Sequence, residues 1–94
     1  MKTIRDLDEI EPFFVTPERI KTVGAGEYTE FHFELSEPVK LPDDTIVNEV
    51  ICLAPSAPEA FKDELETKKV MLAWDRLDWF GGRIIARFPR LVEV

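Results

Sequence analysis

The residue types that most often carry out acid–base or nucleophilic chemistry are scarce in this chain of 94 residues. It has one His, one Cys and one Tyr. His32 lies two residues from both Glu30 and Glu34, so in a β-strand the three side chains share one face. Such a group could form a pH-sensitive patch, because histidine changes charge near neutral pH. The simpler interpretation, which the sequence favours, is a surface histidine in an acidic neighbourhood.

The sequence gives little support for nucleophilic catalysis or for a metal site. Cys52 lies in the apolar run Val50-Ile51-Cys52-Leu53 with no activating motif beside it, and a free cysteine in such a run is usually a small buried hydrophobe. With one cysteine, no intramolecular disulfide can form. A structural zinc ion needs about four nitrogen or sulfur ligands, and the chain offers one His and one Cys. We therefore expect no catalytic residue, no metal and no cofactor.

Phosphate and calcium motifs are also missing from the sequence. The acidic run over residues 6–11 and the pair Asp43-Asp44 do not match a calcium loop, which needs about 12 residues around a central glycine. Neither Gly24-Ala25-Gly26 nor Gly81-Gly82 precedes a helix with the lysine and hydroxyl of a phosphate-binding loop. Both glycine segments are typical of turns, and the sequence favours a protein that is not an enzyme.

Charge is distributed unevenly along the chain. The net charge is −7, and residues 1–49 account for all of it, with 12 acidic and 5 basic side chains. Residues 68–94 instead hold six basic and three acidic side chains. An acidic protein repels phosphate, so direct nucleic-acid binding is disfavoured. The acidic half either meets a basic protein surface or only keeps the protein soluble.

Aromatic residues near the C-terminus are the second candidate for a binding surface. Trp74, Trp79 and Phe80 lie close together, and tryptophan is enriched in interface hot spots. The alternative is that both tryptophans fill the small core. We expect one in the core and one partly exposed. The predicted partner-binding residues are Glu30, His32, Glu34, Trp74 and Trp79.

Alternating polarity predicts a β-hairpin in the middle of the chain. In residues 30–36, Phe31, Phe33 and Leu35 point one way and the polar residues between them the other, which is typical of a half-buried strand. Residues 46–53 form a second strand rich in β-branched residues. The turn at residues 42–45 joins the two into an antiparallel pair.

Helix signals occur at three places. Residues 1–12 form one or two helical turns or an N-terminal arm, which could be loosely ordered, ending at Pro12. Thr16-Pro17-Glu18 predicts the start of a helix of about seven residues that ends at Gly24. Ser56 and Glu59 form a capping box that predicts a helix over residues 57–67.

Residues 68–80 fit either a helix or a strand. Val70 would lie on the opposite face from Phe61 in one straight helix, so we favour a strand at 69–74 and a loop to Gly82. A further strand follows at 83–88. The predicted fold is a single α+β domain over residues 1–94, with an antiparallel sheet of about four strands and two or three short helices packed on one face.

Residues 33–58 carry a family resemblance. They read as a strand with a Ser-Glu-Pro-Val step, a turn, a second strand and a Pro-Ser helix start. This arrangement resembles the N-terminal hairpin of small phage tail assembly chaperones of the Mu and P2 type. Ala54 stands where that family has a basic residue, and the end after Gly81-Gly82 is strand-like rather than helical. The resemblance implies a non-enzymatic partner of tail proteins and transfers no site residues.

Localisation follows from the apolar segments. The N-terminus has no apolar stretch of a signal peptide, and no apolar run approaches the roughly 18 residues of a membrane span. We therefore expect a cytoplasmic protein that does not bind membranes.

The sequence favours a non-enzymatic protein-binding module: a small adaptor, assembly factor or inhibitor, phage-encoded if the resemblance holds. It would use an acidic sheet face and a Trp-containing loop to bind another protein with a basic surface, and homo-oligomers remain open. One alternative is an acidic decoy that mimics nucleic acid and blocks a basic groove. Another is a small enzyme or ligand-binding domain.

Overall fold

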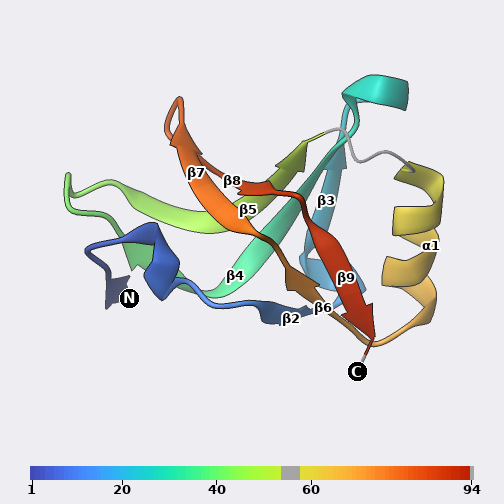
Figure 1. Cartoon of the computed structure of the whole chain (residues 1–94), viewed down its shortest axis with the longest axis horizontal. Coiled ribbons are helices and arrows are strands. Elements are labelled where there is room, and N and C mark those ends of the chain that lie inside the picture. The colour runs from blue at the N-terminus through green and yellow to red at the C-terminus, as the bar shows by residue number, and fades with distance from the viewer. Residues whose placement is uncertain (54–57, 94) are drawn as a thin grey trace.

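Strands dominate the computed structural model, which describes residues 1–53 and 58–93 (Figure 1). Within these residues there are nine strands, one α-helix and three single 3-10 turns. The strands are β1 (Lys2–Thr3), β2 (Phe13–Val15), β3 (Ile20–Val23), β4 (Glu30–Lys40), β5 (Ile46–Leu53), β6 (Val70–Ala73), β7 (Arg76–Phe80), β8 (Arg83–Arg87) and β9 (Arg90–Glu93). The helices are η1 (Leu7–Glu9), η2 (Pro17–Arg19), η3 (Gly26–Tyr28) and α1 (Pro58–Thr67).

The predicted hairpin is confirmed and forms the centre of the larger sheet. β4 and β5 pair antiparallel, from Glu30 opposite Leu53 to Glu34 opposite Glu49. The register shifts after Glu34, and pairing resumes at Val39. β4 therefore runs four residues beyond the predicted end at residue 36. Pro38 lies within the irregular stretch, where a missing backbone N–H is tolerated.

The hairpin is widened on both sides into a six-stranded sheet. Its order is β1-β4-β5-β8-β7, and β3 also pairs with β4. β3 is antiparallel to one end of β4, whereas β1 is parallel to the other end. β5 and β8 are parallel, with Ile51 opposite Ile85. The face carrying Phe31 and Phe33 is the inner face, and the face carrying Glu30 and His32 is the outer face.

A second sheet, of order β2-β6-β9, covers part of the inner face. β6–β7 and β8–β9 form one long hairpin that contributes to both sheets (Figure 1). It bends at Asp75, whose N–H donates to the Arg87 carbonyl at 3.0 Å, and at Phe88, which has a positive φ of 54°. Such bends let strands switch from one packed sheet to the other.

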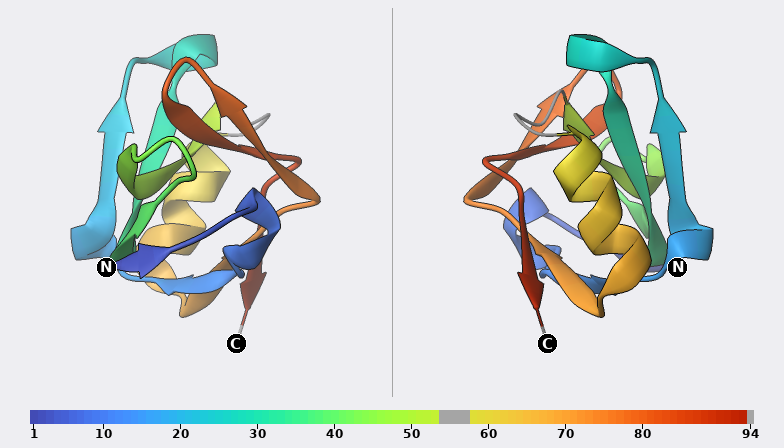
Figure 2. Two further views of the ribbon diagram at one scale, coloured as in Figure 1. Left: turned by 90° about the vertical axis from the view of Figure 1, so that its left-hand side faces the viewer. Right: turned by 90° about the vertical axis from the view of Figure 1, so that its right-hand side faces the viewer.

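The helix α1 closes one end of the core, and its prediction over residues 57–67 is confirmed for Pro58–Thr67. The Phe61 ring lies 5.0 Å from Phe31 and 6.1 Å from Phe33, between ring centroids. Leu65 is buried in the same core. Figure 2 shows the helix beside the sheets at one end of the molecule. The predicted capping residue Ser56 lies outside the described residues.

The predicted fold class is wrong. Over the described residues the structure is mostly sheet, in two sheets with one α-helix, rather than a four-stranded α+β sheet with two or three helices. Thr16-Pro17-Glu18 starts only the turn η2, and residues 20–23 then form β3 against β4. An isolated seven-residue helix is marginal, whereas an edge strand gains backbone hydrogen bonds. Part of the predicted loop after residue 74 is β7, which pairs with β8.

The N-terminal segment 1–12 is anchored rather than loose. The Ile4 N–H donates to the Lys40 carbonyl at 2.9 Å, and β1 pairs with the end of β4. The side chains of Ile4 and Ile10 are 1% and 8% exposed. Burial of two large apolar side chains holds this segment across the open end of the inner face.

Candidate functional site

A pocket of about 230 Å³ lies at the end of the molecule away from α1. Three segments that are distant in sequence surround it: the start of η1, the turn between β4 and β5, and the end of β7. All three face the viewer in the left panel of Figure 2. The lining residues are Arg5, Asp6, Leu7, Leu41, Pro42, Asp43 and Trp79.

Local hydrogen bonds hold the η1 wall. Asp6 accepts from the Asp8 N–H at 3.0 Å, and Glu9 accepts from the N–H groups of Arg5 and Asp6 at 2.6 and 3.0 Å. This reciprocal arrangement is a capping box on a single 3-10 turn. It fixes the backbone on both sides of Leu7, whose partly buried side chain packs against the core.

The β4–β5 turn forms the floor and one rim. The Leu41 N–H donates to the Thr45 carbonyl at 2.8 Å, and the Asp44 N–H donates back to the Leu41 carbonyl at 2.9 Å. Asp44 has a φ of 69°, a conformation that aspartate tolerates better than most residues. Leu41 is buried, whereas Pro42 and Asp43 are exposed. The turn therefore presents an apolar floor with a carboxylate above it.

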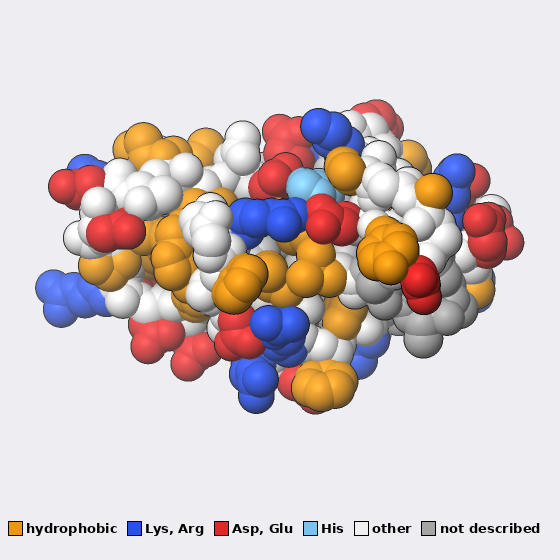
Figure 3. Space-filling model, turned by 90° about the horizontal axis from the view of Figure 1, so that it is seen from above, with side chains coloured by type: hydrophobic (Ala, Val, Ile, Leu, Met, Phe, Trp, Pro, Cys, Tyr) orange, Lys and Arg blue, Asp and Glu red, His pale blue; other side chains and the backbone are white. Residues whose placement is uncertain are grey.

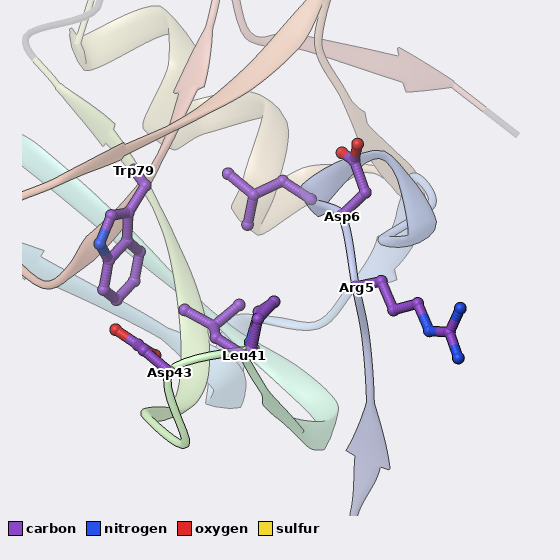
Figure 4. A pocket seen from close by; sticks show the side chains of 7 residues that line it. Arg5, Asp6, Leu41, Asp43 and Trp79 are labelled. Atoms are coloured by element: carbon purple, nitrogen blue, oxygen red, sulfur yellow. The ribbon is translucent and has the colours of Figure 1, made fainter.

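Trp79 forms the opposite wall. It lies opposite Ile84 on the inner face, two residue pairs beyond the buried Leu77. β7 ends the order of the larger sheet, and the Trp79 indole remains 39% exposed. In Figure 4 the Asp43 carboxylate turns to the Trp79 side of the pocket, whereas the charged groups of Arg5 and Asp6 extend away.

Asp43 is the ionised group on this rim. Hydrogen bonds from the side chain and backbone of Thr45 lower the pKa of the Asp43 carboxyl, so it is charged at neutral pH. Within the part of the chain that the structure describes, no ion pair joins Asp43 to a cation. The pocket therefore combines an apolar floor, an aromatic wall and an ionised carboxylate on its rim.

The predicted acidic row on β4 has a different character. Glu30 Oε1 lies 2.9 Å from His32 Nε2 and 2.6 Å from an Arg83 nitrogen. His32 Nδ1 lies 3.0 Å from Glu49 Oε1. Only a doubly protonated ring can donate to both carboxylates at once. Figure 3 shows the single histidine surrounded by acidic and basic side chains. We call Glu30, His32, Glu49 and Arg83 the histidine cluster.

The histidine cluster is a structural feature of the outer face. The hydrogen bond from His32, followed by that from Arg83, lowers the pKa of Glu30. Ile51 lies opposite His32 and Ile85, and both isoleucines are at most 2% exposed. Long polar side chains on the same face shield such an apolar pair with their stems. The charge of Glu30 in this acidic row is therefore largely balanced by other side chains of the same protein.

The five predicted partner-binding residues do not form one surface. Glu30 and His32 are paired on the outer face, and Glu34 is exposed farther along β4. Trp79 lies on the inner face and borders the pocket. Trp74 packs against Phe13, with ring centroids 6.1 Å apart, and borders the core. We expected one tryptophan in the core and one partly exposed; Trp79 is partly exposed, and Trp74 is partly buried against the core rather than within it.

Sequence reasoning missed most of the residues around these two regions. Glu49 could have been found, since the hairpin register places it opposite Glu34. Asp43 was recognised only as a turn residue. Arg83 gave no local signal, because its position depends on a pairing between distant segments.

The remaining reactive group is inaccessible. Cys52 is fully buried, and burial raises the pKa of its thiol to about 12. Across residues 1–53 and 58–93, no cluster of three or more His, Cys, Asp or Glu side chains is arranged to hold a metal ion. No helix in the same ranges has the length and apolar character needed to cross a membrane.

Comparison of the chain with protein-family models, curated proteins and solved structures finds no match. The resemblance to phage tail assembly chaperones therefore stays an expectation.

Proposed function

We propose that the protein is a non-enzymatic protein-binding module, and that the Trp79 pocket receives part of its partner. The observation that carries this proposal is the partly exposed indole beside a preformed apolar floor. Preformed concave sites with apolar walls and few polar groups are typical binding sites. A tryptophan at their edge is a frequent source of binding energy.

The chemistry of the lining supports binding over catalysis. Its seven residues include no histidine, cysteine, serine or lysine, so its two aspartates, Asp6 and Asp43, have no histidine or lysine beside them with which to share a proton. Elsewhere, Cys52 is buried and His32 is held between two carboxylates. An adaptor, assembly factor or inhibitor needs a stable recognition surface and no reactive group.

The charge balance supports a partner with a basic surface. Among the ion pairs of the described residues, only the pair between Arg83 and Glu30 joins a basic residue after position 49 to an acidic residue within residues 1–49. Most acidic side chains of residues 1–49, including Asp43, lie on the exposed surface. A basic partner surface would be attracted to this half of the molecule, mainly through faster association.

Site-specific photo-crosslinking tests the proposal. A benzoylphenylalanine placed at Pro42, on the pocket rim, should crosslink the partner in cells that encode the protein. The matched control carries it at Phe80, next to Trp79 but on the outer face and 69% exposed. We expect a discrete crosslink from position 42 that position 80 does not give.

Binding of the purified partner then tests the role of the indole. Trp79→Ala should weaken affinity at least about tenfold, whereas Phe80→Ala should leave it within about twofold. The affinity should fall only modestly from low to high salt, since salt ions do not screen the packing of an aromatic side chain. A steep salt dependence with equal effects of the two variants would instead support a nucleic-acid mimic.

A further inference from the structure

We infer that the group received by the Trp79 pocket is an arginine side chain of the partner protein. This inference rests on the proposed function and adds the chemistry of the ligand. It follows from three features of the pocket: its apolar floor, its aromatic wall and the ionised carboxylate on its rim.

The floor fits the methylene stem of a long side chain. Leu7, Leu41 and Pro42 supply apolar atoms, and the pocket opens to solvent at its rim. Long basic side chains bury their stems along such surfaces and keep the charged end near water. A purely apolar side chain would leave the rim carboxylate without a partner.

The wall and the rim fit a cation. A cation within about 6 Å of a tryptophan ring is attracted to its face, and Trp79 is open to solvent beside the pocket. Asp43 supplies a charge-assisted acceptor. It already accepts the Thr45 N–H at 3.0 Å, but a carboxylate has about four lone-pair positions and can accept more.

Among the described residues, no cation pairs with Asp43. Arg5 lines the pocket, but its guanidinium extends away from Trp79 and Asp43. Lys40 pairs instead with Asp44, at 3.2 Å. Asp6 also lines the pocket, and Asp8 and Glu9 add negative charge farther along η1. The site thus has an excess of acidic groups that a partner can balance.

Arginine fits better than lysine for two reasons. Its planar guanidinium stacks on an aromatic ring while its N–H groups still point to a carboxylate. It is also more weakly hydrated than an ammonium group, so less solvation is lost against an apolar floor. We therefore expect lysine to bind the same pocket several-fold more weakly.

Short peptides test the inference directly. Four peptides of one uncharged sequence would carry arginine, lysine, norleucine or glutamate at the centre. Binding is followed by the NMR signal of the Trp79 indole N–H, assigned with the Trp79→Phe variant. We expect affinity to fall from arginine to lysine by about threefold and to norleucine by about tenfold. The glutamate peptide should not bind.

A matched pair of variants isolates the charge. Asp43→Asn keeps an acceptor for the Thr45 N–H and removes the charge. It should weaken the arginine peptide about fivefold and leave the norleucine peptide unchanged. Asp44→Asn, in the same turn, keeps a side chain that tolerates the positive φ. It should leave both affinities unchanged.

The outcomes separate the inference from the proposed function. Equal affinity for arginine and norleucine, or equal loss of both in Asp43→Asn, overturns the arginine assignment. The proposed function survives that result if Trp79→Ala still weakens the whole partner. If Trp79→Ala leaves partner binding unchanged, the proposed site is wrong whatever the peptides do.

Discussion

The histidine cluster and the Trp79 pocket are built from similar groups but differ in how their charges are balanced. In the cluster, Glu30 and Glu49 contact His32 or Arg83 within 3.0 Å. In the pocket, Asp43 accepts a hydrogen bond from Thr45 of its own turn and has no ion pair among the described residues, and the Trp79 indole is 39% exposed. The charged groups of the cluster therefore pair with one another, whereas the pocket is exposed to solvent.

The difference shows that acidic composition alone does not locate a binding surface. A carboxylate that is already paired with a cation adds little to the affinity for a second protein, because a new ion pair would first require the existing one to break. A carboxylate beside an uncovered aromatic ring loses no such pair. Variants of the cluster should therefore change stability, and variants of the pocket should change binding.

The largest expected effect lies in the core, behind the strand that carries the histidine cluster. Phe33 is fully buried and packs on Phe61, so Phe33→Ala should lower the free energy of unfolding by about 3–5 kcal/mol. Glu34→Ala, the exposed neighbour on the other face, should be nearly neutral. Urea denaturation measures both. Equal effects would mean that the two faces of β4 are misassigned.

Breaking the histidine cluster should have a smaller effect on stability. Arg83→Met removes the cation of the 2.6 Å pair with Glu30 while keeping an apolar stem. We expect a loss of about 1 kcal/mol, since both partners are partly exposed to solvent. Arginine-peptide binding should not change. Weakened binding without lost stability would make the outer face the functional surface.

The pH dependence of stability gives a finer test of the cluster. Since the pKa of Glu30 is lowered in the folded protein, its stabilising effect is complete above the unfolded value of about 4.3. It is lost as pH falls through the folded pKa. The stability difference between wild type and Glu30→Gln should therefore be constant above pH ~5 and shrink below pH ~4.3. Parallel curves from urea titrations at pH 3–6 would contradict this assignment.

Cys52 provides the smallest and most local readout. Its side chain is inaccessible, and its thiol has a pKa of about 12, so a thiol reagent at pH 8 should react only when the sheet opens. Arg83→Met should raise the labelling rate about fivefold if it costs about 1 kcal/mol. Asp43→Asn should leave the rate unchanged. A faster rate in Asp43→Asn would mean that the pocket also stabilises the sheet.

The sequence by itself determined the elements whose evidence is local. Alternation at Phe31, Phe33 and Leu35 was sufficient for a strand, and the nearby turn paired it with residues 46–53. The helix over residues 58–67 follows from its apolar edge at Phe61 and Leu65. In each case the residues that decide the structure lie within about one turn or one hairpin of each other.

Only the tertiary structure decided the fold class and both sites. Residues 20–23 follow helix signals in the sequence, yet they form a strand. They do so because the backbone groups at the edge of β4 can hydrogen-bond with them. Arg83 meets Glu30 across 53 residues, through the parallel pairing of β5 and β8. The pocket likewise joins η1, a turn and β7. Backbone pairing between distant strands places these side chains, and neither propensity nor periodicity within one segment encodes which strands become neighbours.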